Sequence, residues 1–156
     1  MDKNTVRCAD ETYECEHLII CTGSQTVSLP IQGIDLVSDR THRDALDNKE
    51  LPRSLAIVGG GVIGMEFASF FSSLGVQVTV IEMMNEILNG IDRELAASLR
   101  TEYSKKGVKF LLGAKVTSLS QDDEGIHVHY ENADGANSIC ADKLLMSVDL
   151  RPLTII

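Results

Sequence analysis

The sequence predicts an α/β fold, in which a parallel β-α-β-α-β sheet carries an inserted antiparallel meander of three strands. Three observations predict it. An apolar run at 55–58 is followed by a glycine-rich turn and a helical pattern. Two further apolar runs, 76–82 and 108–112, each follow a helical stretch. Short alternating segments joined by Asp- and Gly-containing turns then fill 115–141 without a helix between them.

The composition limits the kinds of protein that the chain can be. Its 156 residues are enough for one domain with a sizeable core. The net charge of −9 argues against a nucleic-acid partner and means that a phosphate ligand must be attracted locally. The apolar runs are shorter than the ~20 residues that span a bilayer, and the polar N-terminus does not read as a signal peptide. We therefore expect a cytoplasmic protein that binds neither nucleic acid nor a membrane.

Residues 1–24 predict short β segments. Apolar and polar residues alternate on either side of Asp10-Glu11, which suggests a hairpin. The apolar run at 18–21 follows and stops at a Thr-Gly-Ser turn.

Residues 25–53 lack a clear periodicity, so we expect irregular structure there. A short helix is compatible with the residues around 42–46. Three breakers punctuate the segment, namely Pro30, Gly33 and Pro52.

The pattern sharpens at 55–58, a continuous apolar run of the kind found in strands that are buried on both faces of a parallel sheet. The helix that follows is predicted to end near Gly75. Its apolar residues recur at helical spacing, at Ile63, Phe67, Phe70 and Leu74.

The second strand covers 76–82, and the third covers 108–112. Between them, Asp92 is a plausible N-cap for a helix that Gly107 ends. The apolar face expected on this helix contains Leu95, Leu99 and Tyr103. Right-handed crossovers would place the three strands in one parallel sheet. After the meander, the apolar run at 143–148 is expected to return to that sheet.

The sequence predicts no metal site. Two histidines share one face of a predicted strand, opposite the apolar residues of 126–130, and we expect that face to be solvated: His127 and His129. The four cysteines include no C-x-x-C pair and fit no zinc pattern, so we expect reduced, partly buried thiols: Cys8, Cys15, Cys21 and Cys140.

A glycine fingerprint follows the first buried strand. Gly59-x-Gly61-x-x-Gly64 lies between a predicted strand and a predicted helix, and an acid, Glu82, ends the next strand 23 residues after Gly59. This combination is typical of a Rossmann-like dinucleotide-binding unit. Gly59 would permit a tight turn, Gly61 would let a pyrophosphate approach the backbone, and Gly64 would let the helix pack on the strand. The alternative is a glycine-rich turn that holds no ligand.

The N-terminus of the helix after the glycines would supply free N–H groups and a partial positive charge. This is the local attraction that an acidic chain needs for a phosphate ligand. Glu82 favours NAD(H), because a carboxylate can accept hydrogen bonds from both ribose hydroxyls and would repel a 2′-phosphate. FAD uses the same fingerprint, so the spacing does not exclude it.

The chain resembles the flavoprotein pyridine nucleotide-disulfide oxidoreductases, and most of all the dihydrolipoamide dehydrogenase family. Three motifs carry the resemblance over nearly the whole chain. "LPRSLAIVGGGVIGMEFASFFSSLGVQVTVIE" is similar to the opening of that family's NAD domain. "HLIICTGS" resembles the strand and turn that close its first FAD-domain segment. "KLLMSVDLRPLT" resembles the stretch where the chain leaves the NAD domain.

The resemblance implies roles for particular residues. The glycine turn would hold the NAD pyrophosphate, Glu82 the adenosine ribose, Val116 would lie beside the adenine, and Glu66 would reach toward the nicotinamide. A solvated acid in the first helical turn, favoured by the helix dipole, is the alternative for Glu66. The predicted NAD turn also includes Gly60, Val62 and Ile63. In the intact enzyme, FAD would contact Thr22, Gly23 and Ser24.

One position departs from the family pattern, because Asp149 stands where the family has the glycine of "GRRP". A carboxylate there would weaken binding if it lay near the phosphates or the flavin. It could instead be tolerated on a surface or belong to the end of a segment. Asp149 is therefore included among the predicted cofactor-binding residues.

The chain also lacks parts of the resembled enzymes: a C-x-x-x-x-C redox pair, a second glycine fingerprint for FAD, and a C-terminal His and Glu. We therefore expect a domain fragment that binds NAD(H) without turnover and has no catalytic residue of its own. Its parent would be an FAD-dependent, homodimeric dihydrolipoyl dehydrogenase. The expected boundaries are 1–40 for an FAD-domain tail and connector, 41–150 for the NAD(H)-binding domain, and 151–156 for the return to the FAD domain.

Three alternatives stay open at this point. The parent could reduce another disulfide or mercuric ion, or be an NADH oxidase. The chain could be a stand-alone NAD(H)-binding module. A short-chain dehydrogenase is disfavoured, because none of the three tyrosines has a lysine four residues later.

Overall fold

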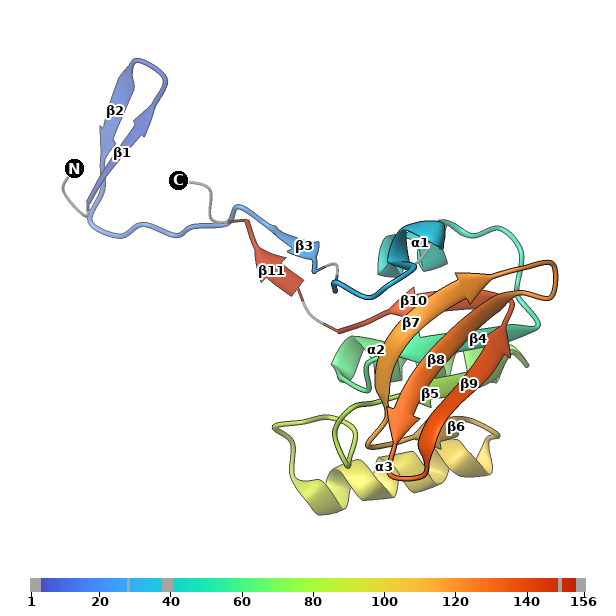
Figure 1. Ribbon diagram of the computed structural model, residues 1–156. Helices are drawn as coiled ribbons and strands as arrows, with labels where there is room; N and C mark the ends of the chain where they lie inside the picture. Colours follow the sequence, from blue (N-terminus) through green and yellow to red (C-terminus); the bar gives the residue numbers. More distant parts are fainter. Residues whose placement is uncertain (1–3, 28, 38–40, 149, 154–156) are drawn as a thin grey trace. The chain divides into compact units, whose positions relative to one another are not determined.

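The computed structural model describes residues 4–27, 29–37, 41–148 and 150–153 (Figure 1). The chain divides into two compact units, one formed by 1–25 with 150–156 and the other by 26–149. The larger unit contains the predicted α/β fold. No helix in the described ranges has the length and apolar character needed to cross a membrane.

The smaller unit begins with the predicted hairpin. Strands β1 (Thr5–Cys8) and β2 (Glu11–Glu14) pair in antiparallel register, with Cys8 opposite Glu11. The turn is thus Ala9-Asp10, one residue earlier than expected, and Ala9 adopts a φ of 53°. Strand β3 (Ser24–Thr26) lies beside β11 (Leu150–Pro152).

The strand that the resemblance implied for the "HLIICTGS" segment was wrong over residues 18–21. These residues form neither a helix nor a strand. A strand needs a neighbour for its backbone groups, and no described strand pairs with this segment. Its apolar side chains are exposed, and Ile19 keeps 83 % of its surface accessible.

The larger unit is built on a four-stranded parallel sheet in the order β10-β4-β5-β6. The strands cover Lys143–Met146, Ser54–Val58, Gln77–Ile81 and Lys109–Leu111. The three strands predicted from the apolar runs, and the return of the chain after the meander, are therefore confirmed. This order places the carboxyl ends of β10, β4 and β5 next to one another at one edge of the sheet.

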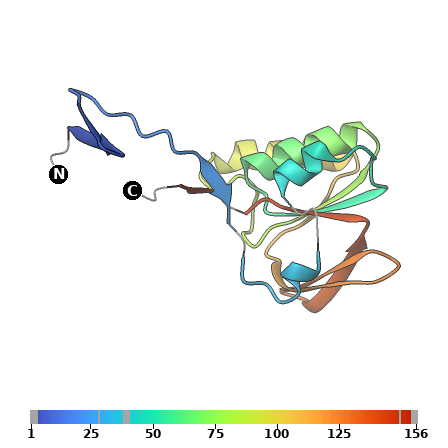
Figure 2. The ribbon, with the colours of Figure 1, turned by 90° about the horizontal axis from the view of Figure 1, so that it is seen from above.

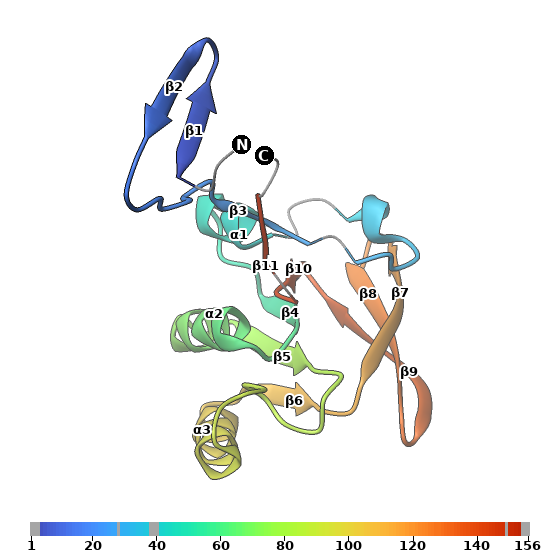
Figure 3. The same ribbon diagram turned by 90° about the vertical axis from the view of Figure 1, so that its left-hand side faces the viewer.

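Helices α2 (Val62–Ser73) and α3 (Arg93–Lys105) cover one face of the parallel sheet (Figures 2 and 3). Asp92 caps α3 as predicted, since its side chain accepts hydrogen bonds from the backbone of Glu94 and Leu95. Short helices η1 (Ile34–Leu36) and α1 (His42–Asp47) precede the sheet. Thr41 and Asp44 form a capping box at the start of α1, which confirms the short helix expected there.

The buried stripe of α2 differs from the one predicted. Phe70 and Leu74 are 54 % and 48 % exposed, whereas the buried residues are Gly64, Met65, Ala68 and Phe71. The close approach of Gly64 to the strand fixes the rotation of the helix, so residues one position away from the expected stripe face the core. In α3, Ala96 is likewise buried and Leu95 is 66 % exposed.

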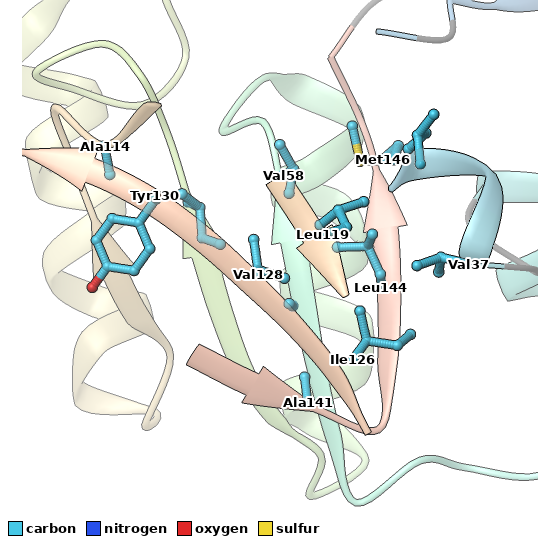
Figure 4. Packing of buried hydrophobic residues seen from close by; sticks show 13 residues of the cluster. Val37, Val58, Ala114, Leu119, Ile126, Val128, Tyr130, Ala141, Leu144 and Met146 are labelled. Atoms are coloured by element: carbon cyan, nitrogen blue, oxygen red, sulfur yellow. The ribbon is translucent and has the colours of Figure 1, made fainter. Parts of the chain in front are cut away.

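The predicted antiparallel meander covers the opposite face of the parallel sheet (Figure 3). Its strands are β7 (Lys115–Gln121), β8 (Ile126–Asn132) and β9 (Gly135–Ala141), in that order. Val58, Leu144 and Met146 of the parallel strands pack with residues of this meander in one buried cluster. Figure 4 shows these side chains between the two sheets.

The meander also shows where the two strand histidines lie. Ile126, Val128 and Tyr130 of β8 are buried on one face. His127 and His129 are half-buried on the other face, where their rings lie 2.9 Å from Asp122 Oδ2 and 3.1 Å from Ser120 Oγ. The hydrogen bond with His127 is the largest cause that lowers the pKa of the Asp122 carboxyl below its usual value. Backbone hydrogen bonds lower this pKa further.

The cysteines are free thiols. Three of them are exposed and Cys15 is half-buried, so the expectation of partial burial holds only for Cys15. Desolvation and nearby carboxylates raise the pKa of the Cys140 thiol. Within the described ranges, no group of three or more His, Cys, Asp or Glu side chains is placed to hold a metal ion.

Candidate dinucleotide-binding site

The glycine turn begins directly after β4. Gly59 has a φ of +107°, a conformation that residues with a side chain rarely adopt. A Cβ on Gly59 would lie 2.3 Å from the carbonyl oxygen of Ser147. The backbone N–H of Gly59 donates to Ile81 O at 2.9 Å. Both conformation and space therefore require glycine here, at the point where the chain turns away from the sheet.

Gly61 and Gly64 meet different requirements. A Cβ on Gly61 would have no atom within 4 Å, so the space in front of the turn is open. Gly61 is the N-cap of α2 and provides no side-chain cap, which leaves the first N–H groups of the helix available to a ligand. A Cβ on Gly64 would lie 2.1 Å from Gly59 O, so Gly64 is what allows α2 to pack on β4.

Gly60 is held by the segment that follows β5. Its N–H donates to Glu82 Oε2 at 2.6 Å, and its carbonyl accepts from the N–H of Leu88 at 2.8 Å. The other carboxylate oxygen of Glu82 accepts from Met84 N at 2.7 Å. An ionised carboxylate has about four lone-pair sites. Glu82 can therefore hold the turn and still accept hydrogen bonds from a ligand.

An ion pair fixes the rest of that segment to α3. Arg100 donates to both carboxylate oxygens of Glu86, at 2.8 and 3.0 Å. Their side chains are 31 % and 15 % exposed. The hydrogen bonds from Arg100 are the largest cause that lowers the pKa of Glu86 below its usual value. The segment 83–91 thus connects α3 to the glycine turn.

A cleft of about 940 Å³ opens at the carboxyl edge of the parallel sheet. Gly59, Gly61, Glu82 and Val116 line it together, although they come from three separate parts of the sequence. Most of the other lining side chains are apolar, and they include Leu29, Pro30, Ile31, Met83 and Met84. Among its described lining residues, the charged ones are Glu82 and Lys115. This is the form of most small-molecule sites, which are apolar clefts with a few polar groups.

The other predicted NAD residues belong to the glycine turn and to α2. Gly60 is the middle residue of the turn, and α2 begins with Val62, Ile63 and Gly64. Glu66 is exposed and is the fifth residue of α2, in its second turn, so its placement in a first helical turn was wrong. None of these residues is among those that line the cleft in the described structure. Asp149 lies outside the described residues.

The three residues predicted for FAD belong to the smaller unit. The hydroxyl of Thr22 donates to the carbonyl of Leu153. The carbonyl of Gly23 accepts from the N–H of Leu153 at 2.9 Å, and Ser24 begins β3. All three are exposed.

Sequence reasoning missed several lining residues. The segment 27–31 was read only as irregular structure, and its apolar residues carry no helical or strand period. Met83 and Met84 follow Glu82 directly in the sequence. Their place beside the predicted ribose site could therefore have been predicted from the sequence. Lys115 precedes the predicted adenine neighbour Val116 in the same way.

Comparison with known proteins shows the family to which the chain belongs. The family model described as pyridine nucleotide-disulphide oxidoreductase matches residues 1–155. The chain is 39 % identical to a dihydrolipoyl dehydrogenase of Haloferax volcanii, over 98 % of this chain and 34 % of that protein.

Two solved structures extend the comparison. The HOCl-induced flavoprotein disulfide reductase RclA from Escherichia coli, as its Cu(II) complex, matches 98 % of this chain and 34 % of its own, with a TM-score of 0.80 and 34 % identity. The water-forming NADH oxidase of Lactobacillus brevis, bound to NADH, matches 92 % of this chain and 33 % of its own, with a TM-score of 0.75 and 28 % identity. The chain therefore spans about a third of the length of these relatives.

Proposed function

Because the chain belongs to the pyridine nucleotide-disulphide oxidoreductase family, we propose that its larger unit binds NAD(H) within an FAD-containing oxidoreductase. One observation carries the proposal. The glycine turn, the N-terminus of α2 and the Glu82 carboxylate meet at a single cleft of about 940 Å³. That cleft fits a dinucleotide, because it offers backbone N–H groups to phosphates, a carboxylate to ribose hydroxyls and apolar walls to a base.

In this proposal each part of the cofactor has its own neighbours. The pyrophosphate lies over Gly61, where a Cβ would meet only open space. The adenosine ribose donates to Glu82, and the adenine lies against Val116 and the apolar residues near it. Glu66, with Val62 and Ile63, lies toward the nicotinamide end. FAD contacts Thr22, Gly23 and Ser24, and the domain boundaries 1–40, 41–150 and 151–156 stay a prediction.

The residues of the cleft favour NAD(H) over NADP(H). A 2′-phosphate on the adenosine ribose would face the Glu82 carboxylate, and like charges at short distance repel. Lys115 is the single cation among the described lining residues, and it is an exposed side chain on a flexible stem. We expect the repulsion of a 2′-phosphate by the Glu82 carboxylate, which hydrogen bonds hold in place, to exceed its attraction by the flexible Lys115 side chain.

The parent enzyme that we propose is a dihydrolipoyl dehydrogenase that acts as a homodimer. Such an enzyme oxidises the two thiols of dihydrolipoamide to a disulfide, and NAD⁺ takes up two electrons and one proton while a second proton is released. FAD supplies the electron transfer between thiols and nicotinamide. The residues of this chain would bind and orient the nucleotide, and we expect the isolated chain to bind NAD(H) without turnover.

A second candidate is a flavoprotein reductase with another substrate. The similarity to the disulfide reductase RclA and to an NADH oxidase favours it, since both match more than nine tenths of this chain. Both candidates use the same cleft for the nucleotide. A stand-alone NAD(H)-binding module would differ from either, and a reading frame that continues on both sides of this sequence would rule it out.

Calorimetric titration of the purified chain with NADH, and separately with NADPH, tests the proposed function. We expect NADH to bind with a Kd in the micromolar to low-millimolar range, roughly −8 to −4 kcal/mol, and NADPH to bind much more weakly. Equal affinity for both would contradict the role of Glu82. The absence of binding for either would mean that the glycine turn has the shape of a dinucleotide site without holding a dinucleotide.

A further inference from the structure

Ser147 carries a hydroxyl group to which the proposed function gives no role. It directly follows β10, and its backbone N–H donates to Val58 O at 2.8 Å. Its Oγ is buried and has no hydrogen-bond partner in the described part of the chain. A buried hydroxyl without a partner destabilises a folded protein, so one that persists calls for an explanation.

The position of Ser147 relates it to the cleft. Ser147 is among the residues that line the cleft, and its carbonyl lies against Gly59, the first glycine of the turn. Side chains alternate between the faces of a strand, and Leu145 packs in the cluster on the helical side of the sheet. Continued to Ser147, one residue beyond the end of β10, this alternation would place the Ser147 side chain on the face where α2 begins.

The order of the strands then gives the part of the ligand that lies near Ser147. At the carboxyl edge, β10, β4 and β5 are neighbours in that order. Ser147 follows β10, the glycine turn follows β4, and Glu82 follows β5. The glycine turn therefore lies between Glu82 and Ser147. A dinucleotide with its adenosine ribose at Glu82 and its pyrophosphate at the turn would extend its other half toward Ser147.

We propose that the Ser147 hydroxyl forms a hydrogen bond with the nicotinamide-ribose half of a bound dinucleotide and positions that half. The proposal rests on the proposed function, because it requires NAD(H) in the cleft. A hydroxyl can donate or accept, and rotation about its bonds adapts it to either partner. Since Oγ has no partner in the described chain, no existing hydrogen bond has to break.

Ser73 offers a matched comparison. Its Oγ donates to Ser69 O at 2.7 Å within α2, and it does not belong to the described lining of the cleft. Each of the variants Ser147→Ala and Ser73→Ala removes one serine Oγ. The Oγ of Ser147 has no hydrogen-bond partner in the described chain, whereas the Oγ of Ser73 has one.

The experiment measures the affinity of three proteins, wild type, Ser147→Ala and Ser73→Ala, for NADH and for ADP by calorimetry. ADP contains the adenosine and both phosphates and lacks the nicotinamide half. We expect Ser147→Ala to weaken NADH binding about two- to tenfold, as for one hydrogen bond, and to leave ADP binding unchanged. Ser73→Ala should change neither affinity. The midpoint of thermal unfolding of Ser147→Ala without ligand should equal or exceed that of the wild type.

The outcomes separate the inference from the proposed function. Equal NADH affinity in wild type and Ser147→Ala overturns the inference, and so does an equal loss of NADH and ADP affinity. If the wild type binds neither ligand, the dinucleotide site itself is wrong and the inference falls with it. If Ser147→Ala does not fold, Ser147→Cys replaces it, because a thiol is only slightly larger than a hydroxyl and is a much weaker hydrogen-bond donor. The same selective loss of NADH affinity is then expected, and an unchanged NADH affinity overturns the inference.

Discussion

The Glu82 carboxylate accepts a hydrogen bond from the backbone N–H of Gly60 at 2.6 Å. This contact joins the acid at the end of β5 to the middle of the glycine turn after β4. The same carboxylate also accepts from Met84 N at 2.7 Å. Glu82 therefore has two roles in our account: it holds the turn in the shape that a pyrophosphate needs, and it recognises the ribose.

Replacing Glu82 with glutamine tests both roles. The amide keeps one acceptor oxygen and presents an NH₂ group to the second backbone donor, so one N–H loses its partner. We expect the free energy of unfolding to fall by about 1–3 kcal/mol and the ratio of NADH to NADPH affinity to fall about tenfold. Denaturant unfolding and calorimetry measure the two effects.

The control for this variant is Glu50→Gln, which removes an equal charge from an exposed position before β4 and outside the described cleft lining. It should leave both the stability and the affinity ratio unchanged. A Glu82→Gln variant as stable as the wild type would contradict the structural role of Glu82. An unchanged affinity ratio would contradict its part in ribose recognition.

Two glycines of the turn should respond in opposite ways to alanine. In Gly61→Ala the new Cβ meets no atom within 4 Å, and the φ of −72° suits any residue. We expect normal stability together with lost NADH binding, because the methyl group occupies the space of the pyrophosphate. In Gly64→Ala the Cβ would lie 2.1 Å from Gly59 O, so we expect a loss of stability of about 3 kcal/mol or more.

Thermal unfolding and NADH titration of both variants check this pair. Normal NADH affinity in Gly61→Ala would mean that the ligand does not approach the turn. A Gly64→Ala variant with the stability of the wild type would contradict the close packing of α2 on β4.

The ion pair of Arg100 with Glu86 predicts a pH dependence. Because Arg100 lowers the pKa of Glu86 in the folded chain, the pair contributes stability above the unfolded pKa, near 4.5, and loses it as the pH falls through the folded pKa. We expect Arg100→Met to lower the free energy of unfolding by about 1 kcal/mol at pH 7 and by much less at about pH 3. Denaturant unfolding at several pH values measures the difference.

Lys105→Met is the matched control, because it breaks an exposed pair with Glu102, in which the side chains are 65 % and 59 % exposed. Its effect should stay within about 0.5 kcal/mol at every pH. If the difference in the free energy of unfolding between Arg100→Met and wild type stays constant from neutral to acidic pH, the ion pair with Glu86 is not its cause.

Lys115 is the one cation among the described lining residues of the cleft, in a chain with a net charge of −9. We expect Lys115→Met to weaken NADH binding about two- to fivefold at low salt and less at high salt, because ions screen exposed charges. Calorimetry at two ionic strengths measures the effect. Lys109→Met in β6 removes a charge outside the cleft lining and should show a smaller change. If the two variants weaken NADH binding equally, the net charge of the chain, and not the position of Lys115, accounts for the attraction of NADH.

Much of the fold was predictable from the sequence, because apolar runs, helix caps and glycine turns are local signals. Asp92 and the strand at 55–58 lie where the pattern predicted them. The face that each helix buries was less predictable. Phe70 of α2 and Leu95 of α3 fit a helical period and are nevertheless exposed. In α2, the close contact of Gly64 with Gly59 decides which face turns toward the core.

The candidate site likewise has one part that the sequence predicts and another that it does not. The glycine turn and Glu82 follow from spacing in the chain, because their roles depend on adjacent elements. The apolar wall formed by Leu29, Pro30 and Ile31 lies in a segment without periodicity, and only tertiary packing brings it to the cleft. The unpaired hydroxyl of Ser147 is equally invisible in a sequence, since burial and hydrogen bonding are properties of the folded chain.

A ¹H–¹⁵N correlation spectrum of the labelled chain, titrated with NADH, tests directly whether the glycine turn, Glu82 and Val116 form one dinucleotide site. We expect the amide signals of Gly59, Gly61, Met84 and Val116 to shift together with a single Kd, because these residues line one cleft. Shifts confined to the amides of 4–16 or 85–96, or no shifts at millimolar NADH, would contradict a dinucleotide site at the glycine turn.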